Sequence, residues 1–154
     1  MTVPNSHTET VIRPASRADL LSVFRIEKRS FEQPWPYVAF ETLLDAPAFF
    51  VAEADGIVVG YIVGDTANTY GMSLGHIKDI AVDPEFRQRG IGRELLSHGV
   101  TTLISHGVDR IKLEVRRDNE TAQSLYTEFG FKLHHTIPNY YDDDEDAYVL
   151  VRKL

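Results

Sequence analysis

The segment GHIKDIAVDPEFRQRGIGRELL, residues 75–96, places a strand, a turn and a helix start in one continuous run. Apolar residues over 76–82 predict a strand, and Asp83-Pro84 is typical of a turn. The spacing of apolar residues then predicts a helix from Gly90 to about His106. A strand that leads through a helix to a further strand is typical of a mixed α/β domain.

The turn before this helix has the chemistry of an anion site. Its glycines let backbone N–H groups approach a ligand at a helix N-terminus, where the dipole favours negative charge, and its arginines add forked donors suited to phosphate. The residues concerned are Arg87, Gln88, Arg89, Gly90, Ile91, Gly92 and Arg93. They indicate a pyrophosphate site, with a helix start bearing a solvated basic face as the alternative. Neither the Gly-Lys-Ser/Thr of a P-loop nor the third glycine of the dinucleotide fingerprint is present.

The remaining periodicity predicts the element order β-α-α-β-β-β-α-β-α-β-β. The expected strands are 11–13, 49–53, 57–63, 76–82, 111–116, 131–137 and 147–153, and the expected helices start at Ser16 and near Pro36 and span 90–106 and 121–129. Asp55-Gly56 predicts a hairpin turn between the second and third strands. The strand–helix–strand unit over 76–116 should place two strands parallel.

Composition limits the class of protein. The chain has 154 residues, which fits one domain over 11–154 preceded by a loose tail over 1–10. A formal net charge of −7 argues against nucleic-acid binding, and the lack of cysteine excludes disulfides and thiolate chemistry. No apolar run reaches the roughly 18 residues of a membrane span, and the polar N-terminus is unlike a signal peptide. We therefore expect a cytosolic protein without membrane contact.

Three motifs together resemble a known family. Arg87-Gln88-Arg89-Gly90-Ile91-Gly92 resembles the Arg/Gln-x-x-Gly-x-Gly/Ala acetyl-CoA signature of the GNAT acyltransferase superfamily. LEVRRDNETAQSLYTEFGF (113–131) and NYYDDDEDAYVL (139–150) follow it in the order found in protein N-terminal acetyltransferases, the bacterial ribosomal-protein alanine enzymes and their archaeal and eukaryotic counterparts. The resemblance implies a mixed, mostly antiparallel sheet with a splayed pair of central parallel strands and about four flanking helices. It also implies acetyl-CoA as cosubstrate in the resulting cleft, and no metal.

The resemblance assigns the cofactor contacts to three places. Ile80, Ala81 and Val82 would bond the pantetheine arm through backbone groups, as an added strand would. Residues 87–93 would hold the pyrophosphate. Asn119 would contact the cofactor from the start of the next helix; a plain N-cap is the alternative, and both roles can hold at once.

The resemblance also assigns the proton transfers. Tyr126 stands where the family has the general acid that reprotonates the CoA thiolate, with a packed core tyrosine as the alternative. A phenol suits this role because its pKa lies above that of a thiol. Glu114 aligns with the base of the bacterial enzymes and His76 with a histidine used in archaeal and eukaryotic relatives, so we expect the two to share a water. The alternatives are an exposed strand glutamate and a strand-end histidine.

Two segments resemble the peptide entrance of the family. SFEQPWPY, residues 30–37, resembles the loop that lines one side, and the paired tyrosines resemble the hairpin on the other side. The substrate-binding residues implied are Phe31, Glu32, Gln33, Trp35, Tyr140 and Tyr141. Packing in the core or at the rim is the alternative for the aromatic residues, above all for Trp35.

The function expected is transfer of acetyl from acetyl-CoA to the N-terminal α-amine of a protein. The alternatives are acetylation of a small amine or a lysine side chain, and a non-catalytic acyl-CoA sensor. A sensor predicts loss of Tyr126 or Glu114, and both are present. We expect a monomer or weak homodimer, with an auxiliary partner possible because some relatives work in complexes.

Overall fold

A seven-stranded mixed sheet forms the frame of the computed structural model, which describes residues 9–154. The strands are β1 (Thr10–Pro14), β2 (Ala48–Ala54), β3 (Ile57–Thr69), β4 (Met72–Val82), β5 (Arg110–Arg116), β6 (Lys132–Ile137) and β7 (Ala147–Lys153). They lie in the order β1-β2-β3-β4-β5-β7-β6, and only β4 and β5 run parallel. The predicted element order and the parallel pair are confirmed.

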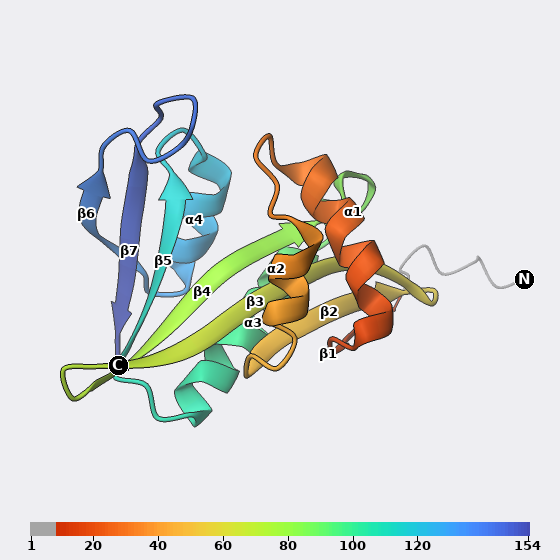
Figure 1. Cartoon of the computed structure of the whole chain (residues 1–154), viewed down its shortest axis with the longest axis horizontal. Coiled ribbons are helices and arrows are strands. Elements are labelled where there is room, and N and C mark those ends of the chain that lie inside the picture. The colour runs from red at the N-terminus through yellow and green to blue at the C-terminus, as the bar shows by residue number, and fades with distance from the viewer. Residues whose placement is uncertain (1–8) are drawn as a thin grey trace, which may run out of the picture.

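Four helices cover the two faces of the sheet (Figure 1). They are α1 (Leu20–Ser30), α2 (Tyr37–Thr42), α3 (Ile91–Ser105) and α4 (Glu120–Glu128), with short 3-10 turns at Arg17–Asp19 and Pro84–Phe86. Helices α1 and α2 pack on one face, and α3 and α4 pack on the other. No helix within residues 9–154 is long and apolar enough to cross a membrane.

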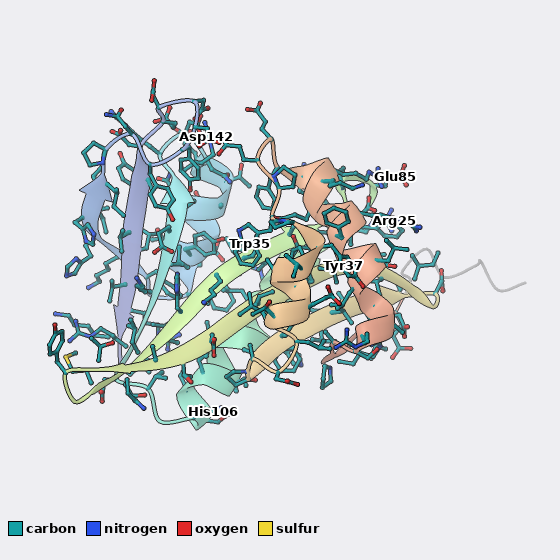
Figure 2. All side chains as sticks on the ribbon, in the orientation of Figure 1. Arg25, Trp35, Tyr37, Glu85, His106 and Asp142 are labelled. Carbon is teal, nitrogen blue, oxygen red and sulfur yellow. The ribbon has the colours of Figure 1, made fainter. Side chains whose placement is uncertain are left out.

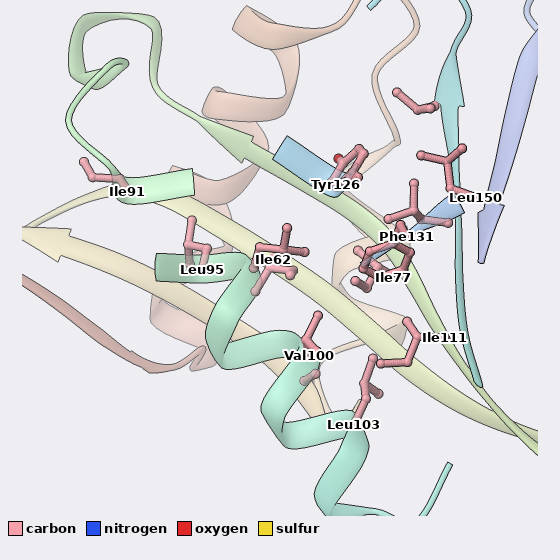
Figure 3. Close-up of a cluster of buried hydrophobic side chains, with 14 of the residues drawn as sticks. Ile62, Ile77, Ile91, Leu95, Val100, Leu103, Ile111, Tyr126, Phe131 and Leu150 are labelled. Atoms are coloured by element: carbon pink, nitrogen blue, oxygen red, sulfur yellow. The ribbon is translucent and has the colours of Figure 1, made fainter. Parts of the chain in front are cut away.

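Each face of the sheet has its own hydrophobic core. Figure 3 shows Leu95, Val100 and Leu103 of α3 packed against Ile62 of β3 and Ile111 of β5 in the larger core. The smaller core lies under α1 and α2, where Leu20, Val23 and Phe40 meet residues of β2 and β3. The two cores identify which face of the sheet each side chain occupies.

The parallel strands β4 and β5 stay paired over only part of their length. Their four paired positions run from Leu74 opposite Arg110 to Ile77 opposite Leu113. Beyond these positions the two strands separate, as Figure 1 shows, and residues 78–82 of β4 and 114–116 of β5 face each other across the divergence. We refer to these two stretches as the splayed segment. The splayed parallel pair implied by the sequence resemblance is confirmed.

A β-bulge marks the point where β4 leaves β5. Val63 of β3 lies opposite Asp79, but the next residue, Gly64, lies opposite Ile77, so Lys78 is an extra residue in β4. A bulge bends its strand and increases the local twist. The bend begins directly after Ile77, the last residue of β4 that pairs with β5.

Several predicted boundaries are wrong in detail. The strands expected at 57–63 and 76–82 are two arms of a longer hairpin, which turns at Tyr70 and Gly71, both with positive φ. Helix α2 carries Phe40 as expected but ends before Leu43. Most of the predicted tail, residues 1–8, lies outside the described residues, and Thr10 belongs to β1, where it pairs with Ala54.

The start of the first helical region is fixed by one carboxylate. Asp19 Oδ2 accepts hydrogen bonds from the Ser16 backbone N–H at 2.8 Å and the Ser16 hydroxyl at 3.0 Å, and both Asp19 oxygens accept from Arg13 of β1 at 2.7 and 2.8 Å. The hydrogen bonds from Arg13 outweigh the effect of burial and lower the pKa of Asp19 to about 2. The predicted helix start at Ser16 is confirmed, and Ser16 and Asp19 form a capping box there.

Candidate active site

A histidine and a glutamate meet where β4 and β5 separate. His76 of β4 lies in register with Lys112 of β5, and its Nε2 is 2.7 Å from Glu114 Oε2. The Lys112 ammonium lies 3.5 Å from the other carboxylate oxygen. Ile111, Leu113 and Val115 of β5 point into the core under α3, so Glu114 occupies the α1/α2 face. The expected water between His76 and Glu114 is replaced by direct contact.

The surroundings of Glu114 keep it ionised. Burial raises the pKa of this carboxyl, but the hydrogen bond and charge of His76, together with the charge of Lys112, outweigh burial. The net pKa of Glu114 therefore lies below its usual value. A carboxylate that stays charged at neutral pH attracts an ammonium group and can accept a hydrogen bond from it. The lowered pKa makes Glu114 a weak base on its own, and the imidazole in contact with it offers a second acceptor for the proton.

Tyr126 approaches the same region from the opposite face of the sheet. It lies on α4, is only 7% exposed, and packs edge-on against Phe131 with ring centroids 6.2 Å apart (Figure 3). Burial, followed by the nearby Asp79 and Tyr141, raises its pKa. Tyr126 belongs to the core under α3, against which Ile80 and Val82 of the splayed segment also pack. The packing alternative describes the Tyr126 ring, and its role as an acid stays a prediction.

The paired tyrosines lie on the Glu114 side of the splayed segment. The rings of Tyr140 and Tyr141 are 5.0 Å apart in an edge-to-face arrangement, and the Arg116 guanidinium lies 4.8 Å from the Tyr141 ring. Burial first, then the charge of Glu114, raises the pKa of Tyr140. Burial first, then Tyr140, raises the pKa of Tyr141 to about 12. Both phenols therefore stay protonated at neutral pH and can donate hydrogen bonds.

The two predicted entrance segments contact each other. The backbone N–H of Asp142, which follows the paired tyrosines, donates to Gln33 Oε1 at 3.3 Å across the space between the two loops. Figure 2 labels Asp142 and Trp35 on these loops. Phe31 and Glu32 are exposed, whereas the Trp35 ring lies 5.4 Å from Phe40 and packs on the smaller core. The packing alternative describes the Trp35 side chain.

The glycine–arginine turn takes the form that an anion site needs. Gln88 and Gly90 both have positive φ, 63° and 81°, and Gly90 is the N-cap of α3. Because α3 begins at Ile91, the backbone N–H groups of its first turn have no partner inside the helix. A Cβ on Gly92 would lie 3.7 Å from Val82 Cγ2, so Gly92 lies against the end of the splayed segment.

The arginine side chains of this turn contact the protein itself. Arg87 Nε donates to the Val82 carbonyl at 3.1 Å, Arg89 lies 4.9 Å from the centre of the Phe86 ring, and Arg93 forms an ion pair with Glu128 of α4. The backbone of the turn, more than these guanidinium groups, is available for a ligand.

The other predicted cofactor residues line the splayed segment. Ile80, Ala81 and Val82 pair on one side with Ile62, Tyr61 and Gly60 of β3, and they lie beyond the last pair with β5 on the other side. Asn119 is the N-cap of α4, where its Oδ1 accepts from the Ala122 N–H at 3.1 Å. This hydrogen bond fixes the Asn119 amide group shortly after β5 ends, at the end of β5 that belongs to the splayed segment.

The profile of the acetyltransferase (GNAT) family matches residues 20–131. The chain belongs to the GNAT acetyltransferase family. This GNAT chain is 34% identical to an N-alpha-acetyltransferase of Sulfurisphaera tokodaii, with 93% of the chain and 92% of the relative covered. It is also 34% identical to a putative ribosomal protein bS18-alanine N-acetyltransferase of Bacillus subtilis, with 93% and 95% covered.

A solved structure supports the same assignment of the fold. Ard1 from Thermoplasma volcanium superposes with a TM-score of 0.86 at 32% identity, over 94% of this chain and 97% of that one. The GNAT fold and the family implied by the three motifs are confirmed. Within residues 9–154, no three His, Asp or Glu side chains are grouped as a metal site.

The structure adds three residues that the sequence did not single out as part of a GNAT site. Glu27 of α1, Tyr61 of β3 and Asp79 of β4 form a hydrogen-bonded cluster beneath the entrance loop. One signal was available, because Glu27 follows Leu20 and Val23 at helical spacing and so lies on the apolar side of its helix. A carboxylate on a buried helix face needs polar partners, and the sequence does not identify them.

Proposed function

We propose that this GNAT protein transfers acetyl from acetyl-CoA to the α-amino group of protein N-termini by direct attack of the amine. The observation that carries the proposal is the placement of an ionised Glu114 with His76 on one face of the splayed segment and a protonated, buried Tyr126 on the other. The names of the relatives, N-alpha- and ribosomal-protein alanine acetyltransferases, support this choice among GNAT reactions.

The residues present fit acetyl-CoA at two points. The N–H groups at the start of α3 would bind the pyrophosphate, and the edge of β4 at residues 80–82 would pair with the amides of the pantetheine arm. Bound in this way, the thioester would lie in the splayed segment between Glu114 with His76 on one side and Tyr126 on the other. Tyr140 and Tyr141 would donate hydrogen bonds to the first backbone carbonyls of the peptide.

Proton transfer follows from the pKa values of the groups. An α-amino group has a pKa of about 7.7–8.0, so Glu114 with His76 needs to remove only one loosely held proton. The amine nitrogen then forms a bond to the thioester carbon while the carbon–sulfur bond breaks. Tyr126, which keeps its proton at neutral pH, donates that proton to the departing sulfur as the carbon–sulfur bond breaks. Acetyl-CoA and newly made protein chains meet in the cytoplasm, where we place this reaction.

Matched peptides test the proposal. The protein is incubated with acetyl-CoA and one of two peptides: one with a free α-amine and no lysine, the other with a blocked N-terminus and an internal lysine. Mass spectrometry should find acetyl on the first peptide only, and Glu114→Gln should slow its appearance about 100-fold or more. Equal acetylation of the blocked peptide would show a lysine acetyltransferase. Binding of acetyl-CoA without transfer to any amine would show a sensor.

A further inference from the structure

A buried hydrogen-bond chain joins the entrance loop to the splayed segment. Glu27 Oε2 accepts from the Trp35 backbone N–H at 2.8 Å, and Glu27 Oε1 lies 2.5 Å from the Tyr61 hydroxyl. The same hydroxyl lies 3.3 Å from Asp79 Oδ2. Glu27 is 2% exposed and Tyr61 is fully buried, so water does not supply alternative partners to these two side chains, whereas Asp79 is half-buried.

The number of protons available to Asp79, Tyr61 and Glu27 determines which group donates and which accepts in each hydrogen bond. A tyrosine hydroxyl has one proton to donate, and the 2.5 Å contact shows that Glu27 receives it. If Asp79 is ionised, its oxygen faces the Tyr61 oxygen with no hydrogen between them. If Asp79 is protonated, it donates to Tyr61, Tyr61 donates to Glu27, and Trp35 donates to Glu27. Only the protonated Asp79 completes every contact.

The electrostatic surroundings favour the same state. Neither Glu27 nor Asp79 forms an ion pair with a cation among residues 9–154, and a buried and a half-buried carboxylate on one phenol cannot both be ionised at low cost. The titratable groups facing Asp79 are Glu27 from α1, Tyr61 from β3 and Tyr126 from α4, while the neighbouring Lys78 is exposed. Burial, followed by Glu27, raises the pKa of Asp79 well above its usual value.

The bulge at Lys78 explains why Asp79 lies in this position. With Lys78 as the extra residue, Asp79 and His76 both occupy the α1/α2 face, although three positions separate them in the strand. Asp79 thus lies on the same face as the proposed base and directly below the helix that leads to the entrance loop.

We propose that Asp79 is a positioning residue of the acetyl-transfer site, which as a neutral acid completes the Asp79–Tyr61–Glu27 chain that anchors Trp35 of the peptide-entrance loop. The inference rests on the proposed function. Ionised Asp79 would compete with Glu27 for the phenol proton and repel Glu27, and the anchor on the Trp35 N–H would weaken. Peptide binding, and not acetyl-CoA binding, would then suffer.

Steady-state kinetics between pH 6 and pH 10 test this role with three variants. Asp79→Ala should raise the KM for the peptide about 3- to 10-fold at all pH values, the size of effect expected from one hydrogen bond. Asp79→Asn, whose amide donates as the neutral acid does, should restore the neutral-pH value. It should also remove the alkaline rise in peptide KM shown by the wild type. The KM for acetyl-CoA should stay unchanged. Asp109→Asn, just before β5 and beside Ser73 at the start of β4, should behave as the wild type.

Two kinetic outcomes would overturn the role of Asp79. One is an alkaline rise in peptide KM that Asp79→Asn shares with the wild type. The other is a fall in kcat for Asp79→Asn with unchanged KM, which would make the ionised carboxylate part of the chemistry.

A second measurement does not depend on activity. A pKa raised by folding gives stability that is present below the unfolded value of about 3.9 and is lost as pH rises through the folded value. The unfolding constant of the wild type, relative to Asp79→Asn, should therefore grow as the pH rises from 5 toward the folded pKa, by up to about tenfold per pH unit. Identical pH dependence of the two proteins would refute the neutral acid. If the wild type acetylates no peptide but this stability difference appears, the proposed function fails and the protonated cluster stands.

Discussion

Tyr126, the proposed acid, is a buried phenol. Its ring is held by Phe131 and the core under α3, and burial raises the pKa of the hydroxyl. Glu114, the proposed base, lies on the other face of the sheet. The two groups proposed to transfer protons thus lie on opposite faces of the sheet at the splayed segment.

Replacement of Tyr126 by Phe should remove the acid and leave the fold intact. We expect kcat to fall about 100-fold or more, the usual contribution of a positioned proton donor, with the affinity for acetyl-CoA little changed. Stopped assays of thiol release measure the rate. Tyr70→Phe, at a fully exposed hairpin tip, is the matched control and should keep the wild-type rate. A Tyr126→Phe protein with full turnover would contradict the assignment.

Residue by residue, the sequence predicted the groups that carry motifs and missed those that depend on register. His76 and Glu114 were expected together, and they touch. Asp79 was not expected to face them, because plain alternation along β4 places Ile80, Lys78 and His76 on one face. The bulge that breaks this alternation forms where β4 pairs with β3. Gly64 of β3 precedes Asp79 of β4 by 15 residues, so no local sequence pattern encodes the bulge.

At the scale of elements, caps and turns fix where each helix starts. Asp19 ties the first helical region to β1 through Arg13, and its low pKa means that its ionised form stabilises the fold. Gly90 fixes the start of α3 in a different way, because as its N-cap it adopts a left-handed backbone conformation that residues with a Cβ seldom adopt.

Asp19→Asn should destabilise the protein in a pH-dependent way. The pKa falls from 3.8 to about 2 on folding, so the loss of unfolding free energy at pH 7 should be about 2 kcal/mol. Because a lowered pKa gives stability that is lost as pH falls, the difference from the wild type should shrink below pH 4 and vanish near pH 2. Denaturant unfolding across this range measures it. Asp45→Asn, an exposed carboxyl after α2, should show no such trend.

Gly90 and Gly92, which are separated by one residue, should differ in how much stability the protein loses when each is replaced by alanine. Gly90→Ala should cost about 1–2 kcal/mol of unfolding free energy, because its φ of 81° is unfavourable for a residue with a Cβ even though nothing lies within 4 Å of that atom. Gly92→Ala has helical φ and only ordinary contacts, so it should be neutral or stabilising by up to about 1 kcal/mol. Thermal unfolding of both variants distinguishes them. Equal destabilisation would mean that the backbone of Gly90 is not under this constraint.

Elements were predictable where local chemistry defines them. The hairpin at Asp55-Gly56, the helix after Gly90 and the last strand at Ala147–Lys153 all have clear local signals, and all were predicted. The outer part of the β3–β4 hairpin was missed because residues 64–75 are polar and exposed toward the tip, so apolar periodicity is weak there. Pairing with the partner strand, not burial, keeps these residues extended.

On the scale of the molecule, two parts of the sheet meet at one short seam. Within the sheet of residues 9–154, strands β1–β4 and strands β5–β7 are paired only through the four residue pairs between β4 and β5. Any ligand held in the splayed segment contacts both parts and substitutes for the missing pairing. We therefore expect acetyl-CoA to act as a structural link as well as a substrate.

Hydrogen exchange with and without acetyl-CoA tests this expectation. Backbone amides of residues 78–82, 91–93 and 114–116 should exchange more slowly in its presence, because the ligand covers the unpaired strand edges and the start of α3. A saturating ligand at about 100 times its Kd should also stabilise the fold by about 2.7 kcal/mol. The outer strands β1 and β6 serve as internal controls and should not change. Protection limited to those outer strands would place the ligand elsewhere.

The extra residue in β4 bends the strand without changing the face that its neighbours occupy. Deletion of Lys78 would leave Ile77 and Asp79 adjacent and facing opposite ways, as they do now, so each side chain would still lie on its own face of the sheet. The strand would only lose its bend away from β5. A protein without Lys78 should therefore keep both hydrophobic cores, while β4 and β5 lie closer together beyond Ile77.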